Sequence, residues 1–411
     1  MAHWRLAGLY FFYFALLGAI MPFWNLYLAA EGYSARDIGL LGAVMMGTKV
    51  ISPYMLGWLA DLTQRPMLTI QWSNLAAFLL FLPIFLLAGE SGVEQGSRTL
   101  HLALIIAAFT FFWNAVIAQY ESVTMLTLGN DYHKYGPIRA WGSVGFIISV
   151  SLLGWIFERV NISALPCVIA MLLMTIWLSS LRTGEPRTAP QPEDLHGLGS
   201  ILFRPPVLAF FFGCFLVKFA HGPYYTFYSI YLDAYGYSTT AIGVLWSIGV
   251  IAELLLFIYM GALLARFSLR MLFSISLFAG ILRWATIGLF PENLALIIVA
   301  QLAHALTFAS YHATAVEWVR RSFGVHHQGQ GQALYSALSF GAGGAVGAIV
   351  SGLLWTDAPS SNWQLTWMMA SLASVAGLLI FVFFASNPNA DNSTPGGEVD
   401  DAGKIKAGPA N

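Results

Sequence analysis

The chain has 411 residues, of which 58% are hydrophobic and only 9% are charged. Soluble domains are roughly half apolar and about a quarter charged, so this composition excludes an ordinary soluble protein and indicates a membrane protein. The net charge of -1 offers no basic surface for nucleic acid. Helices of about 22 residues, repeated along the chain, would use most of its length and leave no room for a separate aqueous domain.

Twelve continuous apolar runs follow one another, each long enough to span a membrane. They lie at 6–30, 38–60, 67–88, 100–126, 138–157, 164–181, 207–232, 241–264, 271–289, 294–319, 332–355 and 365–385. A transmembrane barrel would show shorter segments of alternating polarity, so we predict an all-α membrane protein. The first run is too long for a signal peptide and lacks a cleavage site, so we expect it to be a helix.

A polar segment separates six of these runs from the other six. We predict an N-terminal six-helix half at 1–182, a linker at 183–206, a C-terminal half at 207–386 and a disordered tail at 387–411. With the N-terminus inside, 13 Lys and Arg residues fall in cytoplasmic segments and 3 in the opposite ones. The positive-inside rule then places both termini in the cytoplasm of a multi-pass inner-membrane protein.

The two halves repeat each other in sequence. An offset of 204 positions aligns Gly-Tyr-Ser at 32–34 with Gly-Tyr-Ser at 236–238, and matches continue without a gap from 23 to 68. Parallel halves of this kind are related by an axis along the membrane normal and enclose a central cavity that opens to one side at a time. This architecture is typical of solute transporters.

The segment GWLADLTQR at 57–65 resembles the loop signature of the major facilitator superfamily, with Gln64 in place of its second glycine. The repeat copy at 261–270 carries Ala where the signature has aspartate. By this resemblance we assign Gly57, Asp61 and Arg65, together with Arg139, to a cytoplasmic gate.

Five further stretches are similar to the phenylpropionate permease group of that superfamily. They are YGPIRAWGSVGF at 135–146, HGPYYTF at 221–227, WSIGVIAE at 246–253, RW at 283–284 and QALYS at 332–336. Several of them are shared with sugar and nucleoside proton symporters. The resemblance implies the twelve-helix major facilitator fold and proton-coupled uptake of a small organic solute such as 3-phenylpropionate, with a nucleoside or sugar as the alternative. The fifth run lacks the motif of drug antiporters, which argues against efflux.

Six ionisable side chains lie inside the apolar runs: Lys49, Glu121, Lys218, Glu253, Arg283 and Glu317. A basic or acidic residue near the centre of a span costs about 2.5–3.5 kcal/mol on insertion scales, so these side chains should face a cavity or one another. A paired structural network is the alternative to roles in binding and proton coupling.

Glu253 and Lys49 occupy equivalent positions of the repeat, which favours a pair across the cavity. A carboxylate alternating between an apolar site and a nearby cation suits a proton carrier, so we assign Glu253 to this role and Lys49 to the same machinery. A permanent salt bridge is the alternative. His304 and His312 are about two helical turns apart, so each is a satisfied core histidine or a hydrogen-bond donor near the proton path, and a metal site is not expected.

Lys218, His221, Tyr225 and Tyr228 follow a spacing that places them on one helix face. A lysine binds a carboxylate and tyrosines offer a ring and a hydroxyl, so this face suits an aromatic acid, with packing as the alternative role for the tyrosines. Gly-Pro at 222–223 predicts a kink and a moving helix.

Arg283 is a second candidate anchor for a carboxylate, and the sequence does not rank it against Lys218. Asn25 is expected to line the outer cavity or to form an interhelical hydrogen bond. Glu121 and Arg139 should meet as a structural ion pair. The alternatives are proton coupling by Glu121 and a place near the solute, since lactose-type symporters look similar here, with an acid and an arginine near the sugar. Glu317 has Arg320 and Arg321 one turn away, which favours a local pair.

The glycines at 341–352 miss the dinucleotide-binding spacing and predict close helix packing. Cys167 and Cys214 are interpreted as buried small hydrophobic residues. Motifs of metalloproteases, serine hydrolases and phosphate-binding loops are missing from the sequence, so we expect a transporter, not an enzyme. We expect no cofactor and no metal, only the solute, protons and the lipid bilayer as partners, and function as a monomer.

Overall fold

The computed structural model describes residues 2–87, 94–186, 198–356 and 361–385. Within them, twelve helical stretches are long and apolar enough to span a membrane, and each overlaps one predicted run. They are His3–Ala30, Ala35–Thr63, Pro66–Leu87, Gln95–Leu128, Tyr135–Phe157, Ile162–Ser180, Pro205–Ala234, Thr239–Arg266, Leu269–Leu289, Leu294–Gly324, His327–Leu354 and Asn362–Phe384. The predicted helical membrane fold is therefore confirmed.

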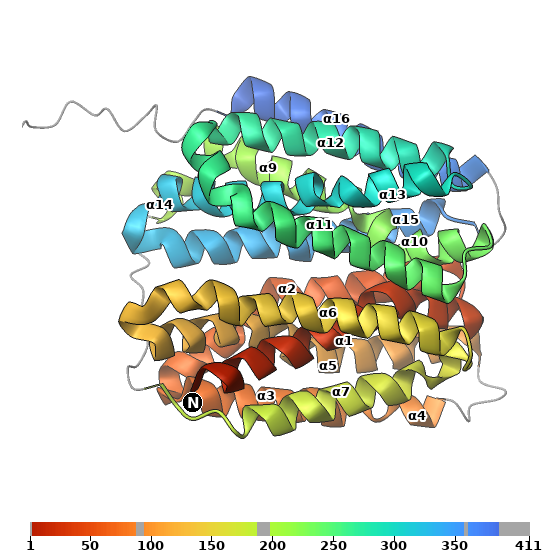
Figure 1. The fold of residues 1–411 in the computed structure, drawn as a ribbon, viewed down its shortest axis with the longest axis horizontal. Helices are drawn as coiled ribbons and strands as arrows, with labels where there is room; N and C mark the ends of the chain where they lie inside the picture. The colour runs from red at the N-terminus through yellow and green to blue at the C-terminus, as the bar shows by residue number, and fades with distance from the viewer. Residues whose placement is uncertain (1, 88–93, 187–197, 357–360, 386–411) are drawn as a thin grey trace, which may run out of the picture.

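The helices form two groups that lie one above the other in Figure 1. The first comprises α1 (Ala2–Ala30), α2 (Ala35–Thr63), α3 (Pro66–Phe81), α4 (Ile84–Leu87), α5 (Gln95–Leu128), α6 (Tyr135–Phe157) and α7 (Leu165–Ser180). After α8 (Leu198–Leu202), the second comprises α9 (Pro205–Ala220), α10 (Gly222–Ala234), α11 (Thr239–Arg266), α12 (Leu269–Leu289), α13 (Leu294–Leu302), α14 (Tyr311–Ser336), α15 (Gly344–Leu354) and α16 (Ser361–Phe384). The predicted tail at 387–411 and positions 187–197 of the predicted linker lie outside the described residues.

The sequence repeat is also a structural repeat. Gly32 and Gly236 both have a φ of 82°, a left-handed conformation that glycine adopts without strain. The serines that follow, Ser34 and Ser238, cap α2 and α11 by accepting a backbone N–H three residues further on. The same turn therefore joins the first two spans of each half, and we name the side of the molecule that carries these turns the turn side.

Two glycine crossings bring the halves together near the turn side. A Cβ on Gly39 of α2 would lie 2.7 Å from the Cα of Gly352 in α15. A Cβ on Gly243 of α11 would lie 2.6 Å from the Val150 carbonyl oxygen of α6, beside Gly154, and a Cβ on Gly154 would lie 2.6 Å from the Thr239 carbonyl oxygen. Gly39 and Gly243 are equivalent positions of the repeat. Because neither pair leaves space for a side chain, the backbones approach closely and the halves are joined on this side.

Hydrogen bonds join the halves at the same level. Asn25 Nδ2 donates to the Tyr225 carbonyl at 2.9 Å, and the Ser151 and Ser247 hydroxyl oxygens are 2.8 Å apart. Thr239 donates to the Gly154 carbonyl at 2.9 Å, and Thr240 donates to the Glu158 carboxylate. The Thr240 hydroxyl holds the pKa of Glu158, which lies outside the spans, below its usual range.

The seventh span is interrupted at His221, between α9 and α10, so the predicted kink is confirmed. The two parts belong to different hydrophobic cores. Phe227 and Tyr231 of α10 lie in a core that continues through the first half, whereas Phe210 and Cys214 of α9 lie in a smaller core within the second half. The span therefore bridges two packed bodies.

The glycine-rich segment packs closely against α9, α10 and α2, as predicted. A Cβ on Gly347 would lie 3.1 Å from the Cα of Gly222, at the break in the seventh span. The prediction for the cysteines is correct for Cys214, which is buried, but wrong for Cys167, which is exposed on α7. An apolar run does not distinguish a core-facing position from a lipid-facing one, which explains this error.

Candidate functional site

The buried charges gather in the second half, close to the break at His221. Lys218 lies at the end of α9, Glu253 in the middle of α11 and Arg283 in α12. Lys218 and Arg283 are each 1% exposed. Transporter sites commonly form near the membrane midplane where a helix is discontinuous, because the break frees backbone groups and the cavity tolerates them.

Lys218 is surrounded by aromatic rings. Its Nζ lies 4.2 Å from the ring centroid of Phe308, 4.1 Å from that of Phe340 and 5.2 Å from that of Tyr311. Among the residues that the structure describes, Nζ has no hydrogen-bond partner. Within the described part of the chain, the ammonium group is therefore buried against these rings without a hydrogen bond or an ion pair.

The four residues expected on one face of the seventh helix divide into two groups. His221 stacks on Tyr225, with ring centroids 5.6 Å apart, whereas Tyr228 turns toward Trp246 and Trp367, with centroids at 5.9 and 6.3 Å. The division falls within α10, because Tyr225 and Tyr228 reach different aromatic neighbours, so the face expected from the spacing is not preserved as one surface.

Arg283 makes two hydrogen bonds within the second half. Its Nε donates to the Ala300 carbonyl and its Nη1 to the Thr307 hydroxyl, both at 2.9 Å. Its guanidinium carbon lies 4.4 Å from the ring centroid of Tyr224 and 4.5 Å from that of Trp284. Arg283 of α12 thus binds both α13 and the π-helical segment that follows it in the tenth span. Of its three guanidinium nitrogens, only Nη2 lacks a partner in the described part of the chain.

Glu253 contacts His304, not Lys49. The Glu253 Oε2 atom lies 3.5 Å from His304 Nε2, and the two side chains are 18% and 7% exposed. Lys49 Nζ contacts the sulfur of Met46 at 3.6 Å. The expected Glu253–Lys49 pair is therefore not formed in this structure, and the Glu253 carboxylate contacts His304 of the tenth span instead.

Four other predicted residues, Glu121, Arg139, Glu317 and His312, have clear partners. Arg139 Nε lies 3.8 Å from Glu121 Oε1, as the ion-pair prediction requires. The carboxylate oxygens of Glu317 lie 2.6 and 2.7 Å from Arg320 and Arg321, which confirms the local pair. His312 Nδ1 is 3.0 Å from the Tyr335 hydroxyl.

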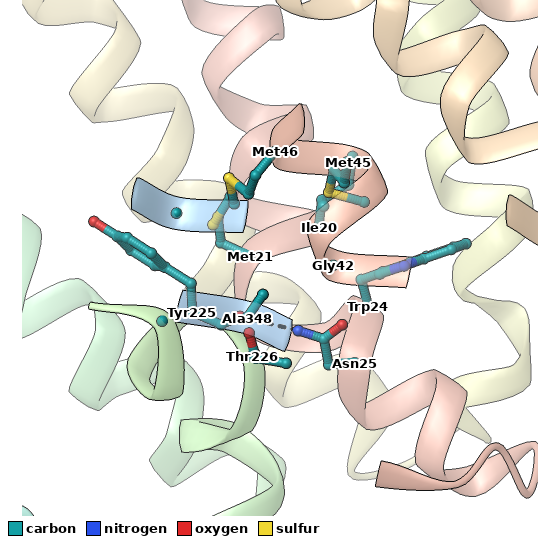
Figure 2. A pocket seen from close by; sticks show the side chains of 12 residues that line it. Ile20, Met21, Trp24, Asn25, Gly42, Met45, Met46, Tyr225, Thr226 and Ala348 are labelled. Atoms are coloured by element: carbon teal, nitrogen blue, oxygen red, sulfur yellow. Dashed lines mark hydrogen bonds between the residues drawn. The ribbon is translucent and has the colours of Figure 1, made fainter. Parts of the chain in front are cut away.

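Asn25 lies in a pocket between the halves, which Figure 2 shows from close by. Its Nδ2 reaches from α1 to the backbone of Tyr225 in α10, and Gly42 and Met46 of α2 line the pocket with Ala348 of α15. The pocket thus combines the polar side chains of Asn25 and Thr226 with apolar and methionine surface, and it is built by both halves.

The predicted gate residues lie away from this pocket, at the end of α2 opposite the turn side. Gly57 has room for a side chain, since a Cβ there would meet only Gln119 at 3.5 Å. Asp61 and Arg65 are exposed. Arg139 lies over the ring of Phe14, at 4.2 Å, near the start of α6.

The sequence did not single out Phe308, Phe340, Gln301 or Thr307. Phe308 and Thr307 lie in a π-helical segment, Ala305–Ser310, and Phe340 lies in another, Ala337–Gly343. Apolar periodicity assigns all four to ordinary span positions, and nothing in the local sequence marks a π-helical turn. Only the structure reveals these residues.

The sequence matches the MFS_1 like family over residues 3–367. The chain belongs to this family. As an MFS_1-like protein it is a multi-pass transporter of the inner membrane and not an enzyme. This agrees with the predicted superfamily and the predicted location.

The relatives of this MFS_1-like chain are named for different transported solutes. It is 30% identical over 362 residues to the probable 3-phenylpropionic acid transporter of Escherichia coli (strain K12), covering 86% of this chain and 90% of the relative. It is 24% identical over 388 residues to the maltose permease of Geobacillus stearothermophilus, covering 92% and 93%. The solved structure of the nucleoside transporter NupG has a TM-score of 0.78 at 19% identity, covering 93% and 98%, and thus shares the fold.

Proposed function

We propose that the chain takes up a small organic carboxylate together with a proton by alternating access, and that the solute is an aromatic acid such as 3-phenylpropionate. The observation that carries this proposal is an excess of buried donors at the break in the seventh span. Lys218 Nζ and Tyr228 Oη are buried, and no partner for these two donors lies within the described ranges. A carboxylate accepts hydrogen bonds at both oxygens, so it supplies what these groups lack.

The Glu253–His304 contact supports proton coupling. Both side chains titrate in principle, they lie 3.5 Å apart, and Glu253 is 18% exposed, so a proton can be shared or exchanged there. We assign Glu253 as the proton carrier and His304 as its partner. Lys49, Glu121 and His312 are the charged or titratable groups that tune this exchange from the surrounding helices.

We further propose that the turn side faces outward and is closed in this conformation. The two bodies are residues 1–182 and 207–386, the linker and both termini are cytoplasmic, and the protein acts as a monomer. The glycine crossings and the Asn25–Tyr225 hydrogen bond support a closed outer gate. Gly57, Asp61, Arg65 and Arg139 then belong to the gate on the inner side.

A nucleoside or sugar is the second candidate solute. The Arg139–Glu121 pair and the free Oδ1 of Asn25 are polar groups that suit hydroxyl-rich ligands. The resemblance to the maltose permease and to the nucleoside transporter favours this candidate, whereas the buried cation Lys218 favours the acid.

Uptake into proteoliposomes tests the proposal. A labelled panel of 3-phenylpropionate, benzoate, uridine and maltose is offered with and without an inward proton gradient. We expect accumulation of the aromatic acids that depends on the gradient. Accumulation of uridine or maltose alone would overturn the acid as solute, and equal uptake without a gradient would overturn proton coupling.

A further inference from the structure

Three aromatic residues enclose the ammonium group of Lys218, and we name Phe308, Tyr311 and Phe340 the Lys218 cage. Phe308 and Phe340 are half-buried, whereas Tyr311 is fully buried. The closed side of the cage is formed by Tyr311 and by Gly343, where an added Cβ would lie 3.2 Å from the Lys218 Cβ. Phe308 and Phe340 are therefore the two rings of the cage that keep accessible surface.

The cage does not compensate the burial of the cation. Contacts between an ammonium group and ring faces offset only a part of the loss of hydration, and a buried charge without an anionic partner is strongly unfavourable. Arg283 differs, because two of its nitrogens already donate to the protein. Lys218 is thus the buried cation whose position calls for an anion.

Both half-buried rings of the cage sit on π-helical turns. Phe308 lies in Ala305–Ser310 and Phe340 lies in Ala337–Gly343. Single π-helical turns inside α-helices occur frequently at functional sites, since they are local departures from the regular hydrogen-bond pattern. Two such turns from separate spans deliver one ring each to the same ammonium group.

We infer that Phe308 and Phe340 are specificity-determining residues, which shield Lys218 when the site is empty and stack on the ring of the solute when its carboxylate binds Lys218. The inference rests on the proposed uptake of an aromatic acid and adds the residues that select it. A neutral solute gains nothing from Lys218 and leaves the ammonium group without an anion. A non-aromatic acid satisfies Lys218 but loses the ring stacking.

The first test replaces the cation in the purified full-length protein. Lys218→Met keeps the length of the side chain and removes the charge, and Lys218→Arg keeps the charge. For Lys218→Met we expect a higher melting temperature without ligand, because an unpaired buried charge is removed, and a loss of at least about 100-fold in affinity for 3-phenylpropionate. Lys218→Arg should retain measurable binding. A lower melting temperature with unchanged affinity would assign Lys218 to the structure and overturn the inference.

The second test separates the rings from the cation. Phe308→Leu and Phe340→Leu are compared in binding of 3-phenylpropionate and of 3-cyclohexylpropionate, which has the same carboxylate and no aromatic ring. Phe212→Leu on α9 is the matched control, because Phe212 is 48% exposed and is not part of the cage. We expect each cage variant to lower the preference for the aromatic acid about 5- to 10-fold, with no change in the control. An unchanged preference in both cage variants would overturn the role of the rings.

These results distinguish the inference from the proposed function. If the wild-type protein binds uridine or maltose and neither acid, the proposed function fails. If it accumulates 3-phenylpropionate and Lys218→Met binds this acid as the wild type does, the proposed function stands and the inference fails.

Discussion

Arg283 and Glu253 are both buried charges of the second half, but they have different kinds of partner. Arg283 donates to a backbone carbonyl and a hydroxyl on the tenth span, which is the arrangement of a structural clamp. Glu253 contacts a histidine that can itself gain or lose a proton. The sequence identified both residues as unusual, but it could not distinguish these roles, since they depend on which neighbour each side chain reaches.

Replacement of Glu253 by glutamine tests the proton carrier. Glutamine keeps the shape and can still contact His304, but it neither binds nor releases a proton at neutral pH. We expect Glu253→Gln to lose uphill accumulation driven by the proton gradient and to retain exchange of labelled for unlabelled solute. Both are measured in proteoliposomes. Gradient-driven accumulation at the wild-type level would remove Glu253 from the coupling machinery.

Gln64 predicts a gain of stability from a single substitution. It has a φ of 53°, in the left-handed region, at the position where the loop signature has glycine. Left-handed geometry costs an L-residue about 1–2 kcal/mol, and glycine avoids this cost. Part of that gain is cancelled, because glycine has a larger conformational entropy in the unfolded state. We expect Gln64→Gly to stabilise the protein by roughly 0.5–1 kcal/mol, seen as a higher melting temperature in detergent. Gln64→Ala, which keeps the strain, should show no such gain.

At the scale of helices, hydropathy alone predicted the spans, because a bilayer requires about 20 apolar residues in sequence. The repeat aligned Gly32 with Gly236, where the structure shows the same turn, and Gly-Pro predicted the break at His221. The two π-helical turns could not be predicted, since they change hydrogen bonding without changing the apolar pattern. The Lys218 cage depends on those turns and therefore also required the structure.

The glycine crossing of α6 and α11 predicts how the turn side closes. A Cβ on Gly243 would lie 2.6 Å from the Val150 carbonyl oxygen, so Gly243→Val should force the halves apart there. We expect at least a tenfold loss of uptake and faster labelling of a cysteine introduced at Thr226, which is 4% exposed. Gly261→Val is the control on the same helix, because nothing lies within 4 Å of its Cβ position. Equal effects of both variants would contradict this account of closure.

At the scale of the whole molecule, the sequence predicted two repeated six-helix halves, and the twelve spans confirm this count among the described residues. The pairing of the halves could not be predicted, because hydropathy does not tell which face of a helix meets the other half. Gly154 and Gly352 illustrate this limit. Both lie in apolar runs, and only their contacts with Gly243 and Gly39 show that they close the turn side.

The contact between Thr240 and Glu158 predicts that this contribution to closure does not change with pH in the neutral range. The hydrogen bond lowers the pKa of Glu158. The charged carboxylate therefore stabilises the closed turn side fully above the usual carboxyl pKa of about 4.3, and this stabilisation is lost only as the pH falls through the lowered pKa. We expect Glu158→Gln to leave the shape of the uptake profile unchanged between about pH 5 and 8. A profile shifted within this range would contradict the lowered pKa.

The break at His221 has a consequence for measurements of motion. Phe227 of α10 stacks on Trp355 at 4.6 Å in the core shared by both halves, whereas Phe210 of α9 stacks on Trp318 at 3.9 Å in the separate core. When the halves part on the turn side, α10 loses the hydrogen bond from Asn25 to the Tyr225 carbonyl, whereas the Phe210–Trp318 stacking of α9 lies within the second half. The distance between two spin labels placed on either side of His221 should therefore change when the turn side opens. In an unbroken helix the same two labels would keep a constant distance.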